Sequence, residues 1–224
     1  MNKLHAERWF GVPLALWLLQ AQLAAAGSID VRVLDPYGQP VPGVAVFIEQ
    51  HDDVSQPPAL PRTAVMDQLD KEFVPHLLIV QKGTAVDFPN SDVIAHHVYS
   101  FSKPNDFVLP LYKGKAHDPI RFDHDGVVTI GCNIHDNMLG YIVVVDTDVF
   151  GVTDESGRVT LPSSDAAQSY QVRIWSPRIR DRVNTLLRRV DAPVAQNAEL
   201  IFSMQEKLWP PHDQQPNSVQ WSDY

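Results

Sequence analysis

The chain has 224 residues, of which 44% are hydrophobic, so it can form one or two domains with packed cores. Its 18 basic and 27 acidic residues give a formal net charge of −9, which argues against a nucleic-acid-binding protein because such proteins present a basic face. A single cysteine excludes an internal disulfide, and the lack of a C-x-x-C-H motif excludes covalently attached c-type haem. Eighteen prolines and eleven glycines indicate many turns and few long helices.

Residues 1–26 have the layout of a secretory signal peptide. Lys3 and Arg8 give a basic start, an apolar stretch runs from Trp9 to Leu19, and small residues precede a cleavage site near Ala26. The alternative is an uncleaved anchor, but the apolar run is shorter than the roughly 20 residues of a membrane span. Without this leader, 16 basic and 26 acidic residues remain, a net charge of −10. The sequence therefore predicts a periplasmic protein that meets a membrane only through its signal peptide.

Two segments with alternating hydrophobic and polar residues follow the leader. Residues 28–34 (SIDVRVL) and 44–50 (VAVFIEQ) each place apolar side chains on one face, and a proline- and glycine-rich turn separates them. This pattern is typical of half-buried β-strands. The polar, proline-rich residues 51–63 predict a connection between two units.

The middle of the chain predicts a series of strands separated by turns. They are 64–68, 77–90 with a turn at Lys82-Gly83, 97–102, 119–123, 127–132 and 141–147. The last of these is a continuous apolar run, which predicts a strand buried on both faces. Residues 103–119 are rich in lysine and proline and predict a looser segment.

The C-terminal part repeats the pattern of the N-terminal part. Residues 150–162 predict two strands around an acidic glycine turn, and residues 170–175 alternate. Residues 180–190 and 199–203 predict a final pair of strands. Residues 205–224 are polar and proline-rich, so they predict a flexible tail. The fold class predicted for the whole chain is all-β.

The only cysteine lies in the segment GCNIHDNMLG, between two predicted strands. Cys132, His135 and Met138 place a thiolate, an imidazole and a thioether on one short loop. Soft ligands combined with imidazole suit copper. A lone thiol in an exported protein is also better explained as a metal ligand than as part of a disulfide scaffold. A further imidazole must come from a distant strand, and either His96 or His97 can supply it.

This ligand set predicts a type 1 copper site, in which two histidines and a cysteine form a plane and a methionine binds weakly on the axis. The alternative is a buried thiol with incidental neighbours. His117, Asp123 and His124 could form a second metal site. The alternative is that they are solvated surface residues, which is the usual role of such residues in polar loops. No nucleophile–base pair or paired carboxylates stand out, so the sequence predicts no enzyme and no catalytic residue.

Two segments, FVPHLLIVQKGTAVDFPNSDVIAHHVYSFS and GCNIHDNMLGYIVVV, resemble the cupredoxin family. In that family a V-x-x-G-T-x-V-x-F-x-N pattern leads into a His-x-Val strand, and a C-x-x-H loop ends the domain. The C-x-x-H-x-x-M spacing is similar to that of amicyanin. Together with LYKGK and GYIVVVDT, the match resembles exported plastocyanin-like proteins labelled methylamine utilisation protein.

The cupredoxin resemblance covers about residues 64–147 and implies a Greek-key β-sandwich with one type 1 copper ion. It implies that the ligands are His96, Cys132, His135 and Met138, because His96 aligns with the histidine of the His-x-Val pattern. The chain departs from the family at two positions. His97 stands where many cupredoxins have asparagine, and Asn137 stands where close relatives have an aromatic residue.

The flanking segments SIDVRVLDPYGQPVPGVAVFIEQ and VTDESGRVTLP are similar to the carboxypeptidase regulatory-like, or transthyretin-like, β-sandwich. That family has a G-x-P-V-x-G-V-x-V hairpin followed by a T-D-x-x-G-x strand pair. Because the copper segment separates the two halves here, the resemblance implies that a cupredoxin domain at 64–147 is inserted into a sandwich formed by 27–63 and 148–204.

The predicted function is a periplasmic carrier of single electrons that exchanges them through the edge of His135. A c-type cytochrome or a periplasmic dehydrogenase would be its partner. A second hypothesis is a copper-binding or copper-sensing module, whose transthyretin-like part docks to a membrane or envelope complex. A third is a structural interaction protein without metal, but the retention of all four ligand types argues against it.

Overall fold

The computed structural model describes residues 27–49, 62–114, 117–162, 169–180, 185–191 and 199–211. Over these residues the chain consists of strands, turns and loops without a helix, which confirms the predicted all-β fold. Accordingly, the described residues include no helix of the length and hydropathy needed to cross a membrane. The predicted signal peptide and most of the predicted 51–63 connection lie outside the described residues.

The described residues form seventeen strands, numbered in chain order. They are β1 (Ser28–Leu34), β2 (Ala45–Ile48), β3 (Thr63–Val65), β4 (Asp67–Leu69), β5 (Glu72–Val74), β6 (Leu77–Gln81), β7 (Thr84–Asp87), β8 (His96–Ser100), β9 (Phe107–Tyr112), β10 (Ile120–Phe122), β11 (Gly126–Gly131), β12 (Leu139–Val145), β13 (Phe150–Val152), β14 (Arg158–Pro162), β15 (Ser169–Trp175), β16 (Thr185–Asp191) and β17 (Glu199–Ser203).

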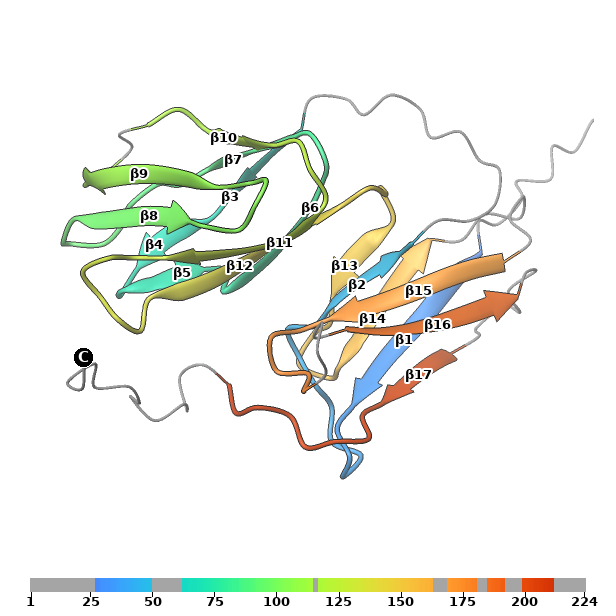
Figure 1. The fold of residues 1–224 in the computed structure, drawn as a ribbon. Coiled ribbons are helices and arrows are strands. Elements are labelled where there is room, and N and C mark those ends of the chain that lie inside the picture. Colours follow the sequence, from blue (N-terminus) through green and yellow to red (C-terminus); the bar gives the residue numbers. More distant parts are fainter. Residues whose placement is uncertain are drawn as a thin grey trace, which may run out of the picture.

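Strands β3 to β12, here called the inner unit, form a sandwich (Figure 1). One sheet has the order β6-β12-β11-β8-β9, the facing sheet has the order β10-β7-β3, and β4 and β5 form a separate hairpin. Alternate side chains of these strands fill a common core, as period-2 patterning requires. Phe73, Phe122 and Ile130 are fully buried there, and Cys132 and Met138 belong to the same cluster.

Strands β1, β2 and β13 to β17, here called the outer unit, form a second pair of sheets, β14-β1-β17 and β13-β2-β15-β16. Their core includes Val31, Ile48 and Phe202. β1 pairs antiparallel with β14 and parallel with β17, so its partners come from the far end of the chain. A hydrogen bond also joins the early and late parts of the chain: the Thr153 hydroxyl donates to the carbonyl of Val41, 112 residues earlier.

The two units meet through a third apolar cluster. Val143 and Val145 of β12 pack there with Trp175 of β15, and the rings of Tyr141 and Trp175 lie 5.3 Å apart between centroids. The intervening Ile142 of β12 faces the core of the inner unit instead. β12 is therefore buried on both faces, as its continuous apolar run predicts. The five-stranded sheet that contains β12 thus lies between the core of the inner unit and the apolar cluster shared with the outer unit.

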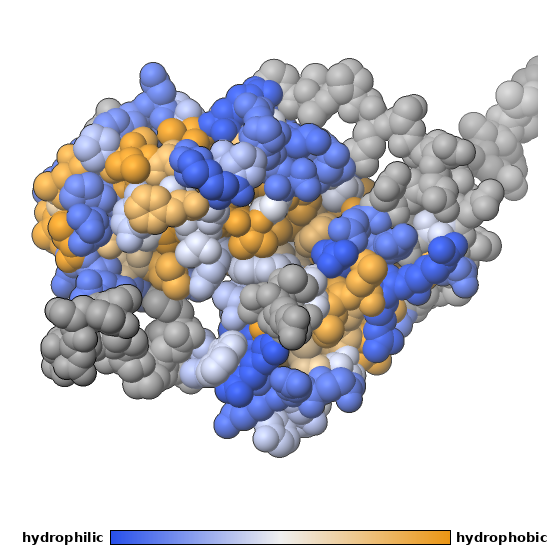
Figure 2. Space-filling view, viewed as in Figure 1, coloured by the Kyte–Doolittle hydropathy of each residue, from blue (hydrophilic) through white to orange (hydrophobic). Residues whose placement is uncertain are grey.

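Within the described residues, the apolar cluster between the units takes its members of the five-stranded sheet from β6 and β12. Farther along this sheet, Phe101 after β8 and Val108 in β9 are 78% and 64% exposed. Hydrophobic atoms are accordingly visible over β8 and β9 in the space-filling view (Figure 2).

Two segments differ from the sequence prediction. Residues 103–119 were predicted to be a looser segment, but they contain the strand β9. This strand tolerates Pro110 because it lies at the edge of the sheet, where no amide donor is needed on the open side. The start of the predicted flexible tail is packed against the outer unit. Leu208 is buried in the outer core, and the Trp209 amide donates to the Arg178 carbonyl at 2.9 Å.

Candidate metal centre

The predicted ligand loop joins β11 to β12 at the end of the inner unit that lies away from the outer unit (Figure 1). The Cys132 amide donates to the Met138 carbonyl at 3.2 Å, and the Met138 amide donates to the His135 carbonyl at 3.0 Å. These two hydrogen bonds close the loop. The strand residue Gly140 is required beside it, because a Cβ there would lie 2.9 Å from the Cβ of Phe73.

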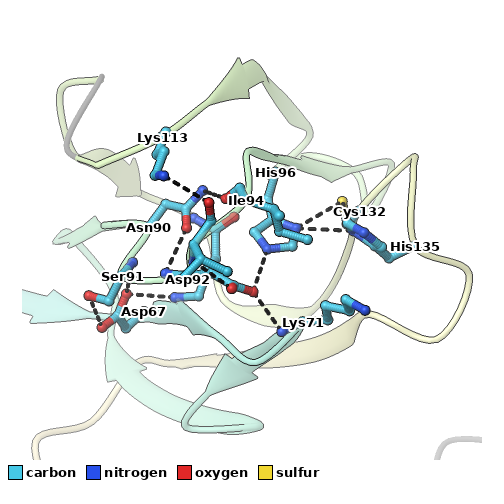
Figure 3. A network of polar contacts seen from close by, with 12 residues as sticks. Asp67, Lys71, Asn90, Ser91, Asp92, Ile94, His96, Lys113, Cys132 and His135 are labelled. Atoms are coloured by element: carbon cyan, nitrogen blue, oxygen red, sulfur yellow. Dashed lines mark hydrogen bonds and ion pairs between the residues drawn. The ribbon is translucent and has the colours of Figure 1, made fainter.

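The structure brings together three of the predicted ligands, His96, Cys132 and His135 (Figure 3). The Nδ1 atoms of the two histidines lie 3.1 Å apart, and Cys132 Sγ lies 3.7 Å from His96 Nδ1 and 3.6 Å from His135 Nδ1. Donors that each lie about 2.0–2.3 Å from a shared ion are about 3–4 Å apart, so these separations fit a single metal ion. Within the described residues, this is the one group of three or more histidine, cysteine or acidic ligands close enough for that.

The ring of His96 is fully buried and oriented by a carboxylate. Its Nε2–H donates to Asp92 Oδ2 at 2.9 Å, which leaves the Nδ1 lone pair directed at Cys132 and His135. The hydrogen bond from His96, followed by the one from the Lys71 amide, lowers the pKa of Asp92 to about 2. Asp92 is therefore ionised at neutral pH and fixes the tautomer that a metal needs.

The loop that carries Asp92 is itself held by side chains. The Asp92 amide donates to Asn90 Oδ1 at 3.0 Å, and the Asn90 side-chain amide donates to the carbonyls of Ile94 and Tyr112. The Ser91 hydroxyl donates to Asp67 of β4 at 2.7 Å. These bonds connect the β4–β5 hairpin, the loop and the start of β8, so that His96 is held from several directions (Figure 3).

His135 is the more accessible histidine of the three-donor group. Partial burial, and then the neighbouring His96 and the positive charge of Lys71, lower the pKa of His135. The adjoining Ile134 is 50% exposed, so His135 emerges beside an apolar surface residue.

Met138 is 2% exposed and packs in the same core cluster as Cys132. Its backbone amide and carbonyl close the ligand loop through the bonds to His135 and Cys132. Its role as the axial ligand stays a prediction.

The alternatives considered from the sequence do not assemble in the described part of the chain. His97 is outside the three-donor group, and its buried Nδ1 has no hydrogen-bond partner among the described residues. His117 lies edge-on to Tyr112, and Asp123 pairs with Arg121 at 2.7 Å. They form no three-ligand group with His124 within the described ranges.

Sequence reasoning missed Asp92, Lys71 and the β4–β5 hairpin. One available signal was Asn90, the last residue of the V-x-x-G-T-x-V-x-F-x-N pattern, which marks the loop before the histidine. A carboxylate four residues before a ligand histidine is a further signal, since ligand histidines usually donate their second N–H to such a group.

Replacing Asp92 by alanine is expected to weaken copper binding about 10- to 100-fold, because loss of a carboxylate that orients a ligand histidine has that effect. Competition with a copper chelator measures the change. The control is Asp106→Ala, which removes an exposed carboxylate that pairs with Lys103 rather than with a ligand. Equal affinity of the Asp92 variant and the wild type would contradict the orienting role.

No family model and no curated protein matches the chain. Among solved structures, the chain is similar to a copper-containing nitrite reductase from Thermus scotoductus SA-01, with 26% identity over 44% of this chain and 26% of that one and a TM-score of 0.37. It is similar to a purple cupredoxin from Nitrosopumilus maritimus, with 19% identity over 38% of this chain and 99% of that one and a TM-score of 0.33. It is also similar to a reduced Cu(I) form of an amicyanin mutant, with 19% identity, coverages of 45% and 98% and a TM-score of 0.35. The match thus spans about a quarter of the nitrite reductase and nearly all of the other two chains.

Proposed function

We propose that the protein is a periplasmic type 1 copper protein that carries single electrons between redox partners. His96, Cys132 and His135 would hold one copper ion, with Met138 as the weak axial ligand. The observation that carries this proposal is the convergence of two imidazole nitrogens and one thiol sulfur within 3.7 Å of one another. A bound copper ion would supply a one-electron couple at this site.

The protein's own residues favour rapid electron exchange over substrate chemistry. His96 is locked by Asp92, and Cys132 is buried at 5% exposure, so the donors have little freedom to rearrange when the oxidation state changes. His135 is partly exposed, whereas His96 and Cys132 are buried, so His135 offers electrons a route to the surface. Among the described residues, the apolar contact between the two units lies on β6 and β12 and does not include the ligand loop.

For the organisation of the chain we propose a cupredoxin domain at 64–147, inserted into a transthyretin-like sandwich formed by 27–63 and 148–204. The separate apolar cores of the two units support this division. A cleaved signal peptide at 1–26 would export the protein, and a c-type cytochrome or a periplasmic dehydrogenase would exchange electrons with it.

A copper-binding or copper-sensing envelope module is the second candidate. The observation that favours it is the outer unit, which has its own core and whose described residues contribute no member of the three-donor group. An electron carrier should exchange electrons rapidly with a cytochrome, whereas a sensor should exchange slowly and bind its partner in a copper-dependent way.

The visible and electron paramagnetic resonance spectra of the mature protein with added Cu(II) test the proposed centre. We expect an intense thiolate-to-copper charge-transfer band and a small copper hyperfine splitting, since both follow from a short copper–thiolate bond. Absence of the band would contradict the copper assignment.

The Met138→Leu variant is expected to remain coloured and to have a higher reduction potential. Loss of the thioether removes a donor that stabilises Cu(II), while the thiolate that produces the colour is retained. Potentiometric titration followed at the visible band measures this shift. A colourless variant would show that Met138 is not the axial ligand.

A further inference from the structure

We propose that Lys71, at the tip of the β4–β5 hairpin, raises the reduction potential of the copper centre and favours anionic electron acceptors at the His135 edge. This inference rests on the proposed copper function. In this proposal Lys71, which is not a ligand, selects redox partners by their charge.

The backbone of Lys71 is attached to the metal centre. Asp70 and Lys71 form the turn of the hairpin with φ values of 52° and 62°, a left-handed conformation that lysine rarely adopts. In this conformation the Lys71 amide donates to Asp92 Oδ2 at 2.9 Å, and the same oxygen accepts the hydrogen bond of His96. The turn therefore has a fixed position relative to one of the ligand histidines.

The strands of the hairpin are anchored in the protein interior. Gln68 of β4 is fully buried, and its side-chain amide donates to the Pro89 carbonyl at 3.0 Å and to the Tyr112 hydroxyl. Phe73 of β5 is 1% exposed and packs against the backbone of Gly140. Because both strands are anchored, the hairpin fixes the backbone of Lys71 beside the centre, while the Lys71 side chain is exposed.

From this anchored backbone, the Lys71 side chain runs toward the His135 side of the centre (Figure 3). Through the shared acceptor Asp92 Oδ2, the same backbone is joined directly to the ligand histidine His96. A nearby positive charge disfavours the oxidised centre, which carries one more positive charge than the reduced one. The same charge attracts anions to the edge where electrons would leave.

The test compares copper-loaded full-length Lys71→Gln, Lys71→Arg and Lys103→Gln with the wild type. Glutamine removes the charge but keeps the amide that binds Asp92, and arginine restores the charge. Lys103→Gln makes the same change in net charge at an exposed lysine paired with Asp106. The readouts are the reduction potential and the oxidation rates of the Cu(I) protein by anionic hexacyanoferrate(III) and by a cationic tris(phenanthroline)cobalt(III) complex.

We expect Lys71→Gln to lower the potential and to reduce the ratio of the anion rate to the cation rate about three- to tenfold at low salt. The difference should shrink as ionic strength rises, because the lysine charge is open to solvent. Lys71→Arg should match the wild type, and Lys103→Gln should leave both quantities nearly unchanged. Asp136→Asn, which removes a negative charge beside His135, should shift the potential upward.

Equal effects of Lys71→Gln and Lys103→Gln in proteins that keep the charge-transfer band would overturn this inference and leave the copper function intact. Absence of the band from the wild type would overturn the copper function and this inference together. The two failures are therefore distinguished by the spectrum of the wild-type protein alone.

Discussion

The Cys132→Ser variant is expected to lose the charge-transfer band completely and to lose rapid electron exchange. The band arises from overlap between the thiolate and copper, and a serine hydroxyl neither ionises as readily nor donates as a soft ligand. Absorption and electron paramagnetic resonance spectra of the Cu(II)-loaded variant measure the loss. Any copper that still binds should give the larger hyperfine splitting of an ordinary nitrogen and oxygen site.

The matched control is Asn133→Ser, which changes the adjacent exposed residue on the same loop. This variant should keep the band and the potential of the wild type. Survival of the band in Cys132→Ser would show that the sulfur seen 3.6–3.7 Å from both imidazoles is not a ligand.

The Phe73→Ala variant is expected to lower the free energy of unfolding of the apoprotein by about 3–5 kcal/mol, the usual cost of truncating a buried phenylalanine. Phe73 is 1% exposed in the core that contains Cys132, and it packs on Gly140 where no side chain fits. Urea denaturation followed by fluorescence measures the change. Because the same hairpin binds Asp92 through Lys71, the copper-loaded variant should also show a shifted visible band.

Phe101→Ala provides the comparison, since Phe101 is 78% exposed and its removal should change the free energy of unfolding by no more than about 0.5 kcal/mol. Similar losses from the two variants would mean that the β4–β5 hairpin is not anchored by Phe73.

Strands in which the burial of successive side chains follows a simple pattern were predictable from the sequence. Alternation over residues 28–34 identified β1, and the continuous apolar run from residue 141 identified β12 as a strand covered on both faces. The ligand loop was also recognisable, because a thiol, an imidazole and a thioether in ten residues are distinctive chemistry. His96 was predicted from the His-x-Val pattern, and its ring lies in the group of three neighbouring donors.

Features that depend on distant parts of the chain were not predictable. The hairpin turn at Asp70 and Lys71 has no glycine or asparagine to mark it, and it is held by a carboxylate 21 residues away. Residues 205–211 have the composition of a loose tail, yet Leu208 is buried in the core of the outer unit. The sequence did not indicate this, because the site that buries Leu208 exists only once the sheets have assembled. β16 and β17 were predicted as a pair, but they join different sheets, because β17 completes its hydrogen bonding beside β1.

β1 pairs with strands from the later part of the chain, and this topology favours one order of folding. Asp30 meets Thr160 across 130 residues, and the amide of Val44 binds Thr153 across 109 residues, so these early segments lack their partners until the later part of the chain is present. All ten strands of the inner unit lie between these partners in sequence. Closing so long a loop costs less entropy once its residues are already compact. We therefore expect the inner unit to fold first and, in doing so, to bring together the two chain segments that form the outer unit.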